Sequence, residues 1–228
     1  MTATWIGWFC SLKGNEFYTQ VGEEFIEDGF NLTGISVHAQ LYKEALEVIL
    51  DVEPEEDEMS TRIPDLSILE PHAKMLYGMI HQRYIITRPG LNQMLAKYQA
   101  GEFGYCPRYY CDGFKVLPCG QHDLPRQSTV RLYCPNCKDI YIPSNNKHAT
   151  IDGAHFGTTF PHLFAQAFPD IIPSRPDYYS QQQQQQQPNT YVAKLFGFRV
   201  NERSKAGPRM AWLRMTPPPP PPPPKSNR

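Results

Sequence analysis

Hydrophobic residues repeat at helical spacing through the N-terminal part of the chain. Within residues 5–50, Leu41, Ala45 and Ile49 follow one another at intervals of four, which places all three on one face of a helix. We therefore expect this segment to be helical, with that face directed into a core.

A second helical block occupies residues 70–100. In this block Leu76 and Ile80 are separated by one helical turn and lie on the same face. The triplet 88–90, Arg-Pro-Gly, interrupts the pattern, which resumes after it. Together the two blocks predict an all-helical N-terminal domain over residues 1–100.

Glycine, proline, cysteine and tyrosine become frequent after residue 100, and the hydrophobic spacing changes. Residues 129–133 and 140–142 are rich in β-branched and aromatic side chains, which is typical of strands. We expect a second, smaller β domain over residues 101–165. The predicted fold class is therefore α+β, with the helical domain first.

The rest of the chain contains one segment with core-forming side chains between two low-complexity segments. Residues 166–190 are rich in proline and include seven consecutive glutamines, so they predict a linker. Residues 191–200 predict an extended segment with Phe196 and Phe198 on one side. These rings either bind a partner or fold back onto the β domain. Residues 201–228 are basic and include eight consecutive prolines, which predicts a disordered tail.

The formal net charge of −1 hides an uneven distribution. Residues 1–100 contain 15 acidic and 7 basic residues, whereas residues 194–228 contain 8 basic and 1 acidic residue. The near-neutral total argues against bulk attraction to nucleic acid or to a membrane. No apolar run reaches the ~18 residues that a membrane span needs. The N-terminus lacks the features of a signal peptide, so we expect the cysteines in a reducing compartment.

The strongest local charge lies in residues 51–58, where six of eight residues are acidic. Such a block repels itself and does not pack into a core. It is either a solvated loop or a strip that binds polycations, such as polyamines and basic protein substrates. Its acidic residues are Asp51, Glu53, Glu55, Glu56, Asp57 and Glu58.

Four of the six cysteines form two close pairs. Four residues separate the cysteines of the first pair, two separate those of the second, and 22 lie between the pairs. This spacing is typical of a four-cysteine zinc ribbon, and a reducing compartment favours zinc over disulfides. Four thiolates leave no open coordination position, so we expect a structural site. The predicted zinc ligands are Cys106, Cys111, Cys134 and Cys137.

No motif of an enzyme accompanies these cysteines. The chain has no glycine-rich phosphate loop and no His-Arg-Asp or Asp-Phe-Gly triplet, and a zinc enzyme would need an open metal position. A nucleic-acid-binding zinc ribbon would need a basic face, whereas residues 101–165 have six basic and five acidic residues. The sequence favours a binding or scaffold role, with the nucleic-acid-binding ribbon as the alternative.

Several short motifs along the chain occur in a distinctive order. They are Trp5-Ile6-x-Trp8-Phe9-Cys10, Gly14-Asn15-Glu16-Phe17, Phe30-Asn31-Leu32-Thr33-Gly34, Met75-Leu76-Tyr77-Gly78, Gly104-Tyr105-Cys106-Pro107-Arg108, Leu132-Tyr133-Cys134-Pro135 and Asp152-Gly153-Ala154. In this order they resemble the casein kinase II regulatory (beta) subunit family. The resemblance extends from about Trp5 to Val200.

The resemblance implies a helical domain followed by a zinc ribbon with one structural Zn²⁺ per chain. Two ribbons form a homodimer at positions that match Pro107, Tyr109 and Ile140, whose alternative role is packing within the ribbon. The dimer binds two catalytic alpha subunits and forms a tetrameric Ser/Thr kinase of the cytoplasm and nucleus. In that complex the regulatory subunit is not catalytic, but it stabilises the kinase and alters its choice of substrate.

The resemblance also implies that the C-terminal segment docks on the catalytic subunit through Leu195, Phe196 and Phe198. Gly197, between the two aromatic residues, permits a tight turn. The family usually has tyrosine at the position of Phe196. Three further features depart from the family: the serine-rich acidic N-terminal motif is missing, and the glutamine tract and the polyproline tail are added. They indicate a divergent or specialised member.

Overall fold

The computed structural model describes residues 4–52, 66–108, 111, 113–171 and 194–199. These residues belong to two units, which we treat separately: the body, residues 4–171, and the hairpin, residues 194–199. The tail predicted over residues 201–228 and most of the predicted linker lie outside the described residues.

Short helical segments replace the long helical stretch expected near the N-terminus, so that prediction is wrong in its continuity. Helical conformation is not possible where glycine adopts the left-handed region, at Gly14 (φ 112°) and Gly34 (φ 78°). The predicted face is confirmed for Ala45 and Ile49, which are buried, whereas Leu41 precedes the helix with a φ of 53°. The segments are α1 (Trp5–Ser11), α2 (Glu23–Glu27), η1 (Ile35–Val37, a 3₁₀ turn) and α3 (Tyr42–Ile49).

Two longer helices complete the helical region. The predicted face of the first is confirmed, because Leu76 and Ile80 are fully buried. The triplet 88–90 begins the second helix, which the Thr87 hydroxyl caps by accepting a hydrogen bond from the Gly90 N–H at 3.3 Å. The interruption expected in the pattern is therefore a helix start. The two helices are α4 (Leu66–Tyr84) and α5 (Arg88–Ala100).

A small antiparallel sheet follows the helices, in the strand order β1-β2-β3. Leu117 pairs with Tyr133 between β1 and β2, and Leu132 pairs with Tyr141 between β2 and β3. Both predicted strands are confirmed, as β2 and β3, with shifted ends. β1 was not predicted, because it is short and contains Pro118, a residue that argues against a strand. Proline is tolerated here because β1 lies at the edge of the sheet. The strands are β1 (Leu117–Cys119), β2 (Arg131–Cys134) and β3 (Asp139–Tyr141).

Helical turns return after the sheet, in a region expected to be β-rich. The helix α6 packs next to β1, and its Phe160 and Phe164 are fully buried. The segments are η3 (His148–Thr150), η4 (Gly153–His155), α6 (Phe160–Ala167) and η5 (Pro169–Ile171).

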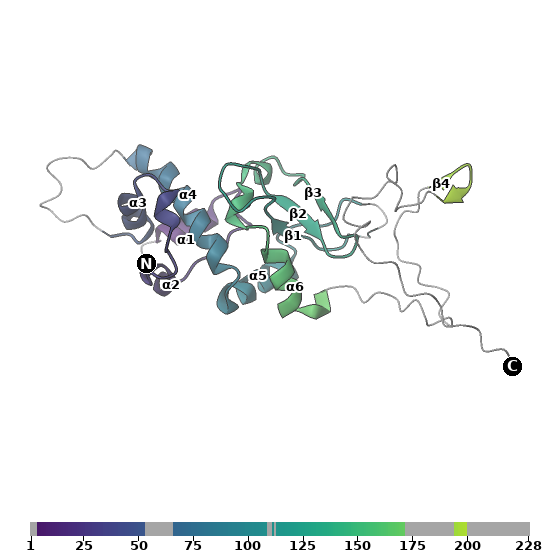
Figure 1. The fold of residues 1–228 in the computed structure, drawn as a ribbon, viewed down its shortest axis with the longest axis horizontal. Helices are drawn as coiled ribbons and strands as arrows, with labels where there is room; N and C mark the ends of the chain where they lie inside the picture. The colour runs from purple at the N-terminus through teal and green to yellow at the C-terminus, as the bar shows by residue number, and fades with distance from the viewer. Residues whose placement is uncertain (1–3, 53–65, 109–110, 112, 172–193, 200–228) are drawn as a thin grey trace, which may run out of the picture. The chain divides into compact units, whose positions relative to one another are not determined.

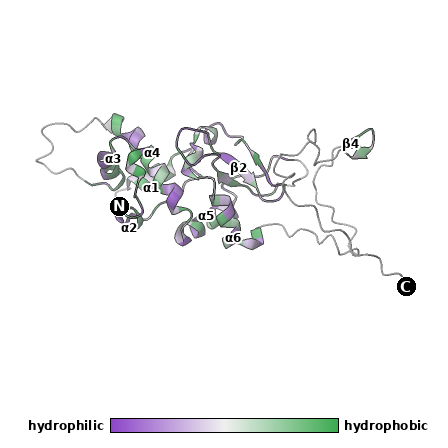
Figure 2. Cartoon of the chain, in the orientation of Figure 1, coloured by the Kyte–Doolittle hydropathy of each residue, from purple (hydrophilic) through white to green (hydrophobic). Residues whose placement is uncertain are grey.

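The helices and the sheet lie next to one another in the body (Figure 1), and they share one hydrophobic core. Tyr77 of α4, Leu117 of β1 and Phe164 of α6 are fully buried in it, and hydrophobic and hydrophilic positions are interleaved along the helices (Figure 2). Helices with a small antiparallel sheet agree with the α+β class. The domain boundaries expected after residues 100, 165 and 190 stay predictions. Within the described residues, no helix is both long and apolar enough to cross a membrane.

Polar groups join α4 to η4 inside this core. His81 accepts a hydrogen bond from the Thr19 N–H at Nε2 (3.1 Å) and donates one from Nδ1 to the His155 carbonyl (2.8 Å). The Tyr18 hydroxyl lies 2.6 Å from Nδ1 of His155. Burial lowers the pKa of His81 to about 3 and that of His155 to about 4, so both imidazoles are neutral. The His155 ring lies directly against Gly78 of helix α4. Only glycine leaves room for the ring at this position, because a Cβ atom would overlap it.

The hairpin places two residues in a tight turn between its strands. Phe196 and Gly197 have φ values of 49° and 86°, as a two-residue type I′ turn requires. The turn expected at Gly197 is confirmed, but the extended strand with both rings on one side is wrong, because Phe196 occupies the turn while Phe198 pairs with Leu195. The strands are β4 (Lys194–Leu195) and β5 (Phe198–Arg199).

We predict that Gly78→Ala destabilises the body. The added methyl group would overlap the His155 ring, and overpacking typically costs about 1–3 kcal/mol, against a gain of up to ~1 kcal/mol in helix propensity. Chemical denaturation should show the loss. Gly29→Ala is the matched control, since nothing lies within 4 Å of its added Cβ. A Gly78→Ala variant as stable as the parent would contradict the packing at this junction.

Candidate metal centre

Two separate parts of the chain carry the four predicted cysteine ligands. Cys106 and Cys111 belong to the loop before β1, while Cys134 ends β2 and Cys137 lies in the turn to β3. The Cys106 N–H donates to the Phe114 carbonyl at 2.7 Å, which closes the first loop on itself. All four cysteine side chains are buried.

The four sulfur atoms lie within 4.8 Å of one another. The Sγ atoms of Cys106 and Cys137 are 3.8 Å apart, and those of Cys111 and Cys134 are 3.5 Å apart. A tetrahedral ion with metal–sulfur bonds of ~2.3 Å places its sulfurs about 3.8 Å apart, whereas a disulfide needs about 2.05 Å. The sulfur positions therefore fit one metal ion, and neither pair is a disulfide. The structure brings together the four cysteines that the sequence predicts as ligands.

Two neighbouring side chains donate hydrogen bonds to these sulfurs. Asn136 Nδ2 lies 3.1 Å from Sγ of Cys111, and the Tyr141 hydroxyl lies 3.0 Å from Sγ of Cys137. A hydrogen bond from Cys134, with that from Tyr141, lowers the pKa of Cys137 against the opposing effect of burial. Such donors stabilise the thiolate that a metal ion requires. Sequence reasoning missed both, although Asn136 lies between the cysteines of the second pair.

The other two cysteines stand apart from the cluster. Cys119 lies in β1, where burial raises its pKa to about 12. Burial also raises the pKa of Cys10, whose sulfur lies 3.6 Å from the Tyr77 hydroxyl. Thiols of raised pKa stay protonated near neutral pH and are poor nucleophiles and ligands.

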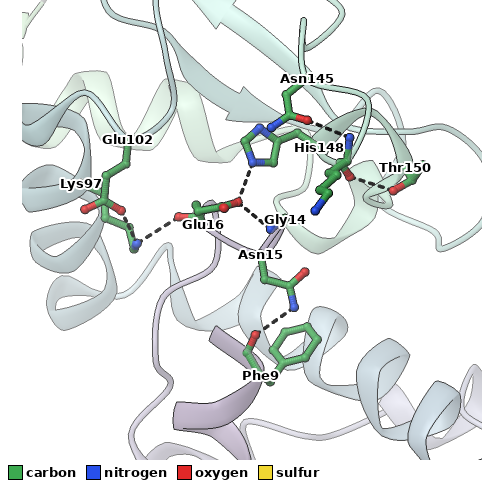
Figure 3. Close-up of polar contacts among 10 residues, drawn as sticks. Phe9, Gly14, Asn15, Glu16, Lys97, Glu102, Asn145, His148 and Thr150 are labelled. Carbon is green, nitrogen blue, oxygen red and sulfur yellow. Dashed lines mark hydrogen bonds and ion pairs between the residues drawn. The ribbon is translucent and has the colours of Figure 1, made fainter. Parts of the chain in front are cut away.

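Glu16 ties the N-terminal loop to two other parts of the body (Figure 3). Its carboxylate accepts hydrogen bonds from Nε2 of His148 (2.7 Å) and from the Gly14 N–H (2.9 Å). Its carbonyl accepts one from the Lys97 ammonium at 3.0 Å, and that ammonium also pairs with Glu102. Desolvation would raise the pKa of Glu16, but these bonds to the carboxylate lower it to about 2. The segment around His148 is thereby held against the helical region.

The residues expected at a dimer interface lie near the cluster where they are described. Pro107 is exposed and follows Cys106, and Ile140 is half-buried in β3, an edge strand. Ile142, just after β3, is 65% exposed. Tyr109 lies outside the described residues.

Most of the acidic strip lies outside the described residues, including Glu53 to Glu58. Asp51 is the described acidic member, and its carboxylate accepts a hydrogen bond from the Trp5 N–H at 2.8 Å. Asp51 therefore caps the start of α1, where a negative charge is favourable.

The three side chains expected to dock on a kinase all lie in the hairpin and are exposed. The exposed fractions are 66% for Leu195, 93% for Phe196 and 80% for Phe198. Exposed apolar side chains that lie together are common at sites of protein interaction.

A buried cluster of four cysteines on a small antiparallel sheet, packed on helices, gives this mixed α and β body a site that is compatible with a metal ion. Its closed set of four sulfur ligands is that of a structural site. The model of the casein kinase II regulatory subunit family matches residues 4–199. The chain belongs to that family.

Individual relatives agree with the family match. The chain is 47% identical over 213 residues to casein kinase II subunit beta-2 of Schizosaccharomyces pombe, covering 93% of this chain and 79% of the relative. It is 44% identical over 240 residues to casein kinase II subunit beta of Candida albicans, with coverages of 93% and 79%. For casein kinase II subunit beta of Saccharomyces cerevisiae the identity is 39% over 242 residues, with coverages of 93% and 84%.

We predict that Cys106→Ser loses the metal and unfolds the sheet, because binding at a structural site is coupled to folding. Elemental analysis of the purified chain should give about one equivalent of metal for the parent and less than about half an equivalent for the variant. Cys119→Ser, a buried cysteine outside the cluster, should keep the metal. Full occupancy in Cys106→Ser would remove this cysteine from the ligand set.

Proposed function

We propose that this chain is a non-catalytic subunit that dimerises and binds catalytic subunits of casein kinase II in a two-plus-two complex of the cytoplasm and nucleus. In that complex it stabilises the kinase and alters its choice of substrate. The observation that supports the proposal is an exposed aromatic hairpin in a chain whose family match extends to residue 199, the end of that hairpin.

The metal in the four-cysteine cluster is zinc in this proposal. Four convergent thiolates in a tetrahedral arrangement are a ligand set that zinc favours. The ion has a structural role, since four sulfur ligands leave no position for a reacting water. It holds the loop before β1 against the turn after β2.

Dimerisation through the ribbon is the second part of the proposal. Pro107 and Ile140 lie beside the cluster, and Ile142 adds an exposed apolar side chain next to the unpaired edge of β3. A two-fold axis near this edge would bury the same apolar patch on both copies. Pairing or covering the edge strand would also shield its backbone N–H and C=O groups, which otherwise promote aggregation. Tyr109 joins this surface by the family resemblance. Sedimentation of the full chain as a monomer at micromolar concentration would contradict the dimer.

The hairpin supplies the surface that binds the kinase. Its type I′ turn projects Phe196 at the tip, and Leu195 pairs with Phe198 beside it. Preformed hairpins lose little conformational entropy on binding, so their apolar side chains contribute efficiently to affinity. The hairpin would insert these three side chains into a hydrophobic cleft of the catalytic subunit.

We predict that Phe196→Ala combined with Phe198→Ala abolishes kinase recruitment. Aromatic anchors in a pocket commonly cost ~2 kcal/mol or more on truncation, a loss of about 30-fold in affinity or greater. Calorimetric titration of the catalytic subunit with the full chain measures the loss.

Metal content and dimer mass should be unchanged in the double variant. Phe30→Ala is the matched control, because this exposed ring (83%) lies in the body rather than the hairpin. An unchanged dissociation constant for the double variant would place the docking surface elsewhere.

The acidic strip, residues 51–58, binds polycations in this proposal. Its charge density would attract polyamines and basic substrates through screened electrostatics. We predict that replacing Glu55, Glu56, Asp57 and Glu58 by the corresponding amides weakens spermine binding, and that added salt weakens it in the parent. Equal binding by parent and variant at low salt would leave a solvated loop without this role.

The alternative function, a nucleic-acid-binding zinc ribbon, is not favoured. The chain belongs to a family of kinase regulatory subunits, and residues 101–165 carry nearly balanced charges, six basic against five acidic. Nucleic-acid binding would need a basic face.

A further inference from the structure

A cavity of about 520 Å³ lies in the body between the N-terminal loop, helix α4 and residues 147–155. None of the residues that line it belongs to the cysteine cluster. Cavities of roughly 300–1,000 Å³ accept small organic molecules. The proposed dimer and the proposed kinase docking make no use of it.

The lining of this cavity is strongly basic. Both oxygens of the acidic residue Asp152 accept backbone N–H groups, from Arg126 at 2.5 Å and from Ala154 at 3.0 Å. Lys74 pairs with Glu70 at 2.6 Å, whereas the other basic side chains form no ion pair among the residues that the structure describes. The charged lining residues are Lys13, Lys74, Arg126 and Lys147, against the single acid Asp152.

Four positive charges against one negative charge give the lining residues a net charge of three, which the Glu70 partner of Lys74 reduces to two. Lys13 and Lys74 nevertheless belong to a region, residues 1–100, in which acidic residues outnumber basic ones by 15 to 7. The positive charge is therefore concentrated locally, and segments far apart in the sequence contribute to it. Basic side chains around a concave, low-dielectric surface attract anions.

The inner wall of the cavity is aromatic and buried. It includes the buried side chains of Phe9, Tyr18 and His155. Nε2 of His155 has no hydrogen-bond partner among the described residues. If the Tyr18 hydroxyl donates to Nδ1 of His155, the ring proton lies on Nε2, which is then the one unpaired group of this pair. In the opposite tautomer both the Tyr18 O–H and Nε2 would lack a partner, which is less favourable.

The basic rim is held in place by contacts on both sides. The bond between Glu16 and His148 joins the N-terminal loop to the segment that carries Lys147 (Figure 3). Gly14 permits their close approach, since a Cβ there would lie 3.2 Å from Cβ of Lys147. Arg126 adopts a left-handed φ of 64°, uncommon for a residue with a side chain. The backbone that carries Lys147 and Arg126 is thus fixed by contacts within the body.

We propose that this cavity binds a small polyphosphorylated molecule. Its volume exceeds what one phosphate group fills, and its four basic residues come from separate segments, as the recognition of several phosphates requires. Lysine and arginine are the side chains that bind phosphate oxygens most strongly. The aromatic side of the cavity, which includes Phe9 and Tyr18, is left for the remainder of the ligand.

Calorimetric titration of the full chain with inorganic tripolyphosphate, and separately with ATP, tests the proposal. Saturable binding of tripolyphosphate is expected at low salt, and added salt should weaken it. Lys147→Gln combined with Arg126→Gln should reduce the affinity about tenfold or more, as loss of two charged contacts implies. Tighter binding of ATP would assign the aromatic wall to a nucleoside, whereas equal binding would assign recognition to the phosphate chain alone.

Both substituted side chains are exposed, so the variant should keep its fold. Arg88→Gln is the matched control, because Arg88 is exposed and does not line the cavity. Metal content is measured before and after titration, since polyphosphates chelate metal ions. Absence of saturable binding, or equal binding by the double variant and Arg88→Gln, would overturn the proposal.

Discussion

The convergence of four cysteine side chains is the interaction on which the β part of the body depends. Its strands contain only three or four residues each, too few for their hydrogen bonds to hold a sheet alone. The sulfurs of Cys106 and Cys137 meet at 3.8 Å, so the loop before β1 is joined to the turn after β2. Because the free energy of binding at a structural metal site is also folding free energy, the sheet and the surface beside it would depend on the proposed ion. The proposed dimer contact, on the β3 edge, depends on it in turn.

A second, polar connection couples this sheet region to the helices. Nδ1 of His81 in α4 donates to the carbonyl of His155 in η4, and the approach is close because α4 has Gly78 at the contact. Glu16 adds an outer connection to His148. These contacts explain why one core extends through both regions. His155 also lines the basic cavity, together with Lys74 of α4 and Lys147, so a ligand there would contact both regions at once.

The sequence predicted those features that depend on residue type and local spacing. The cysteine spacing identifies the cluster because metal ligation depends on ligand chemistry, and the repeat through Leu76 and Ile80 identifies the buried face of α4. Features set by tertiary contacts were not predictable: the His81–His155 contact joins residues 74 positions apart. The sequence pattern also did not predict short elements such as β1. The helix expected near the N-terminus is divided into shorter segments at glycines. Phe196 and Gly197 form the two central residues of a type I′ turn. The preference for this turn determines the position of Phe196, and the alternating side-chain pattern of a strand does not.

The central claim is that a metal-dependent dimer presents hairpins to kinase subunits, and one measurement tests it most directly. Native mass spectrometry of the full chain, co-purified with a casein kinase II catalytic subunit, determines chain stoichiometry and metal content together. The account predicts a complex of two copies of this chain, two Zn²⁺ ions and two catalytic subunits, from which Phe196→Ala with Phe198→Ala removes the catalytic subunits and leaves the zinc-bound dimer. A metal-free or monomeric chain that still bound the kinase would contradict it.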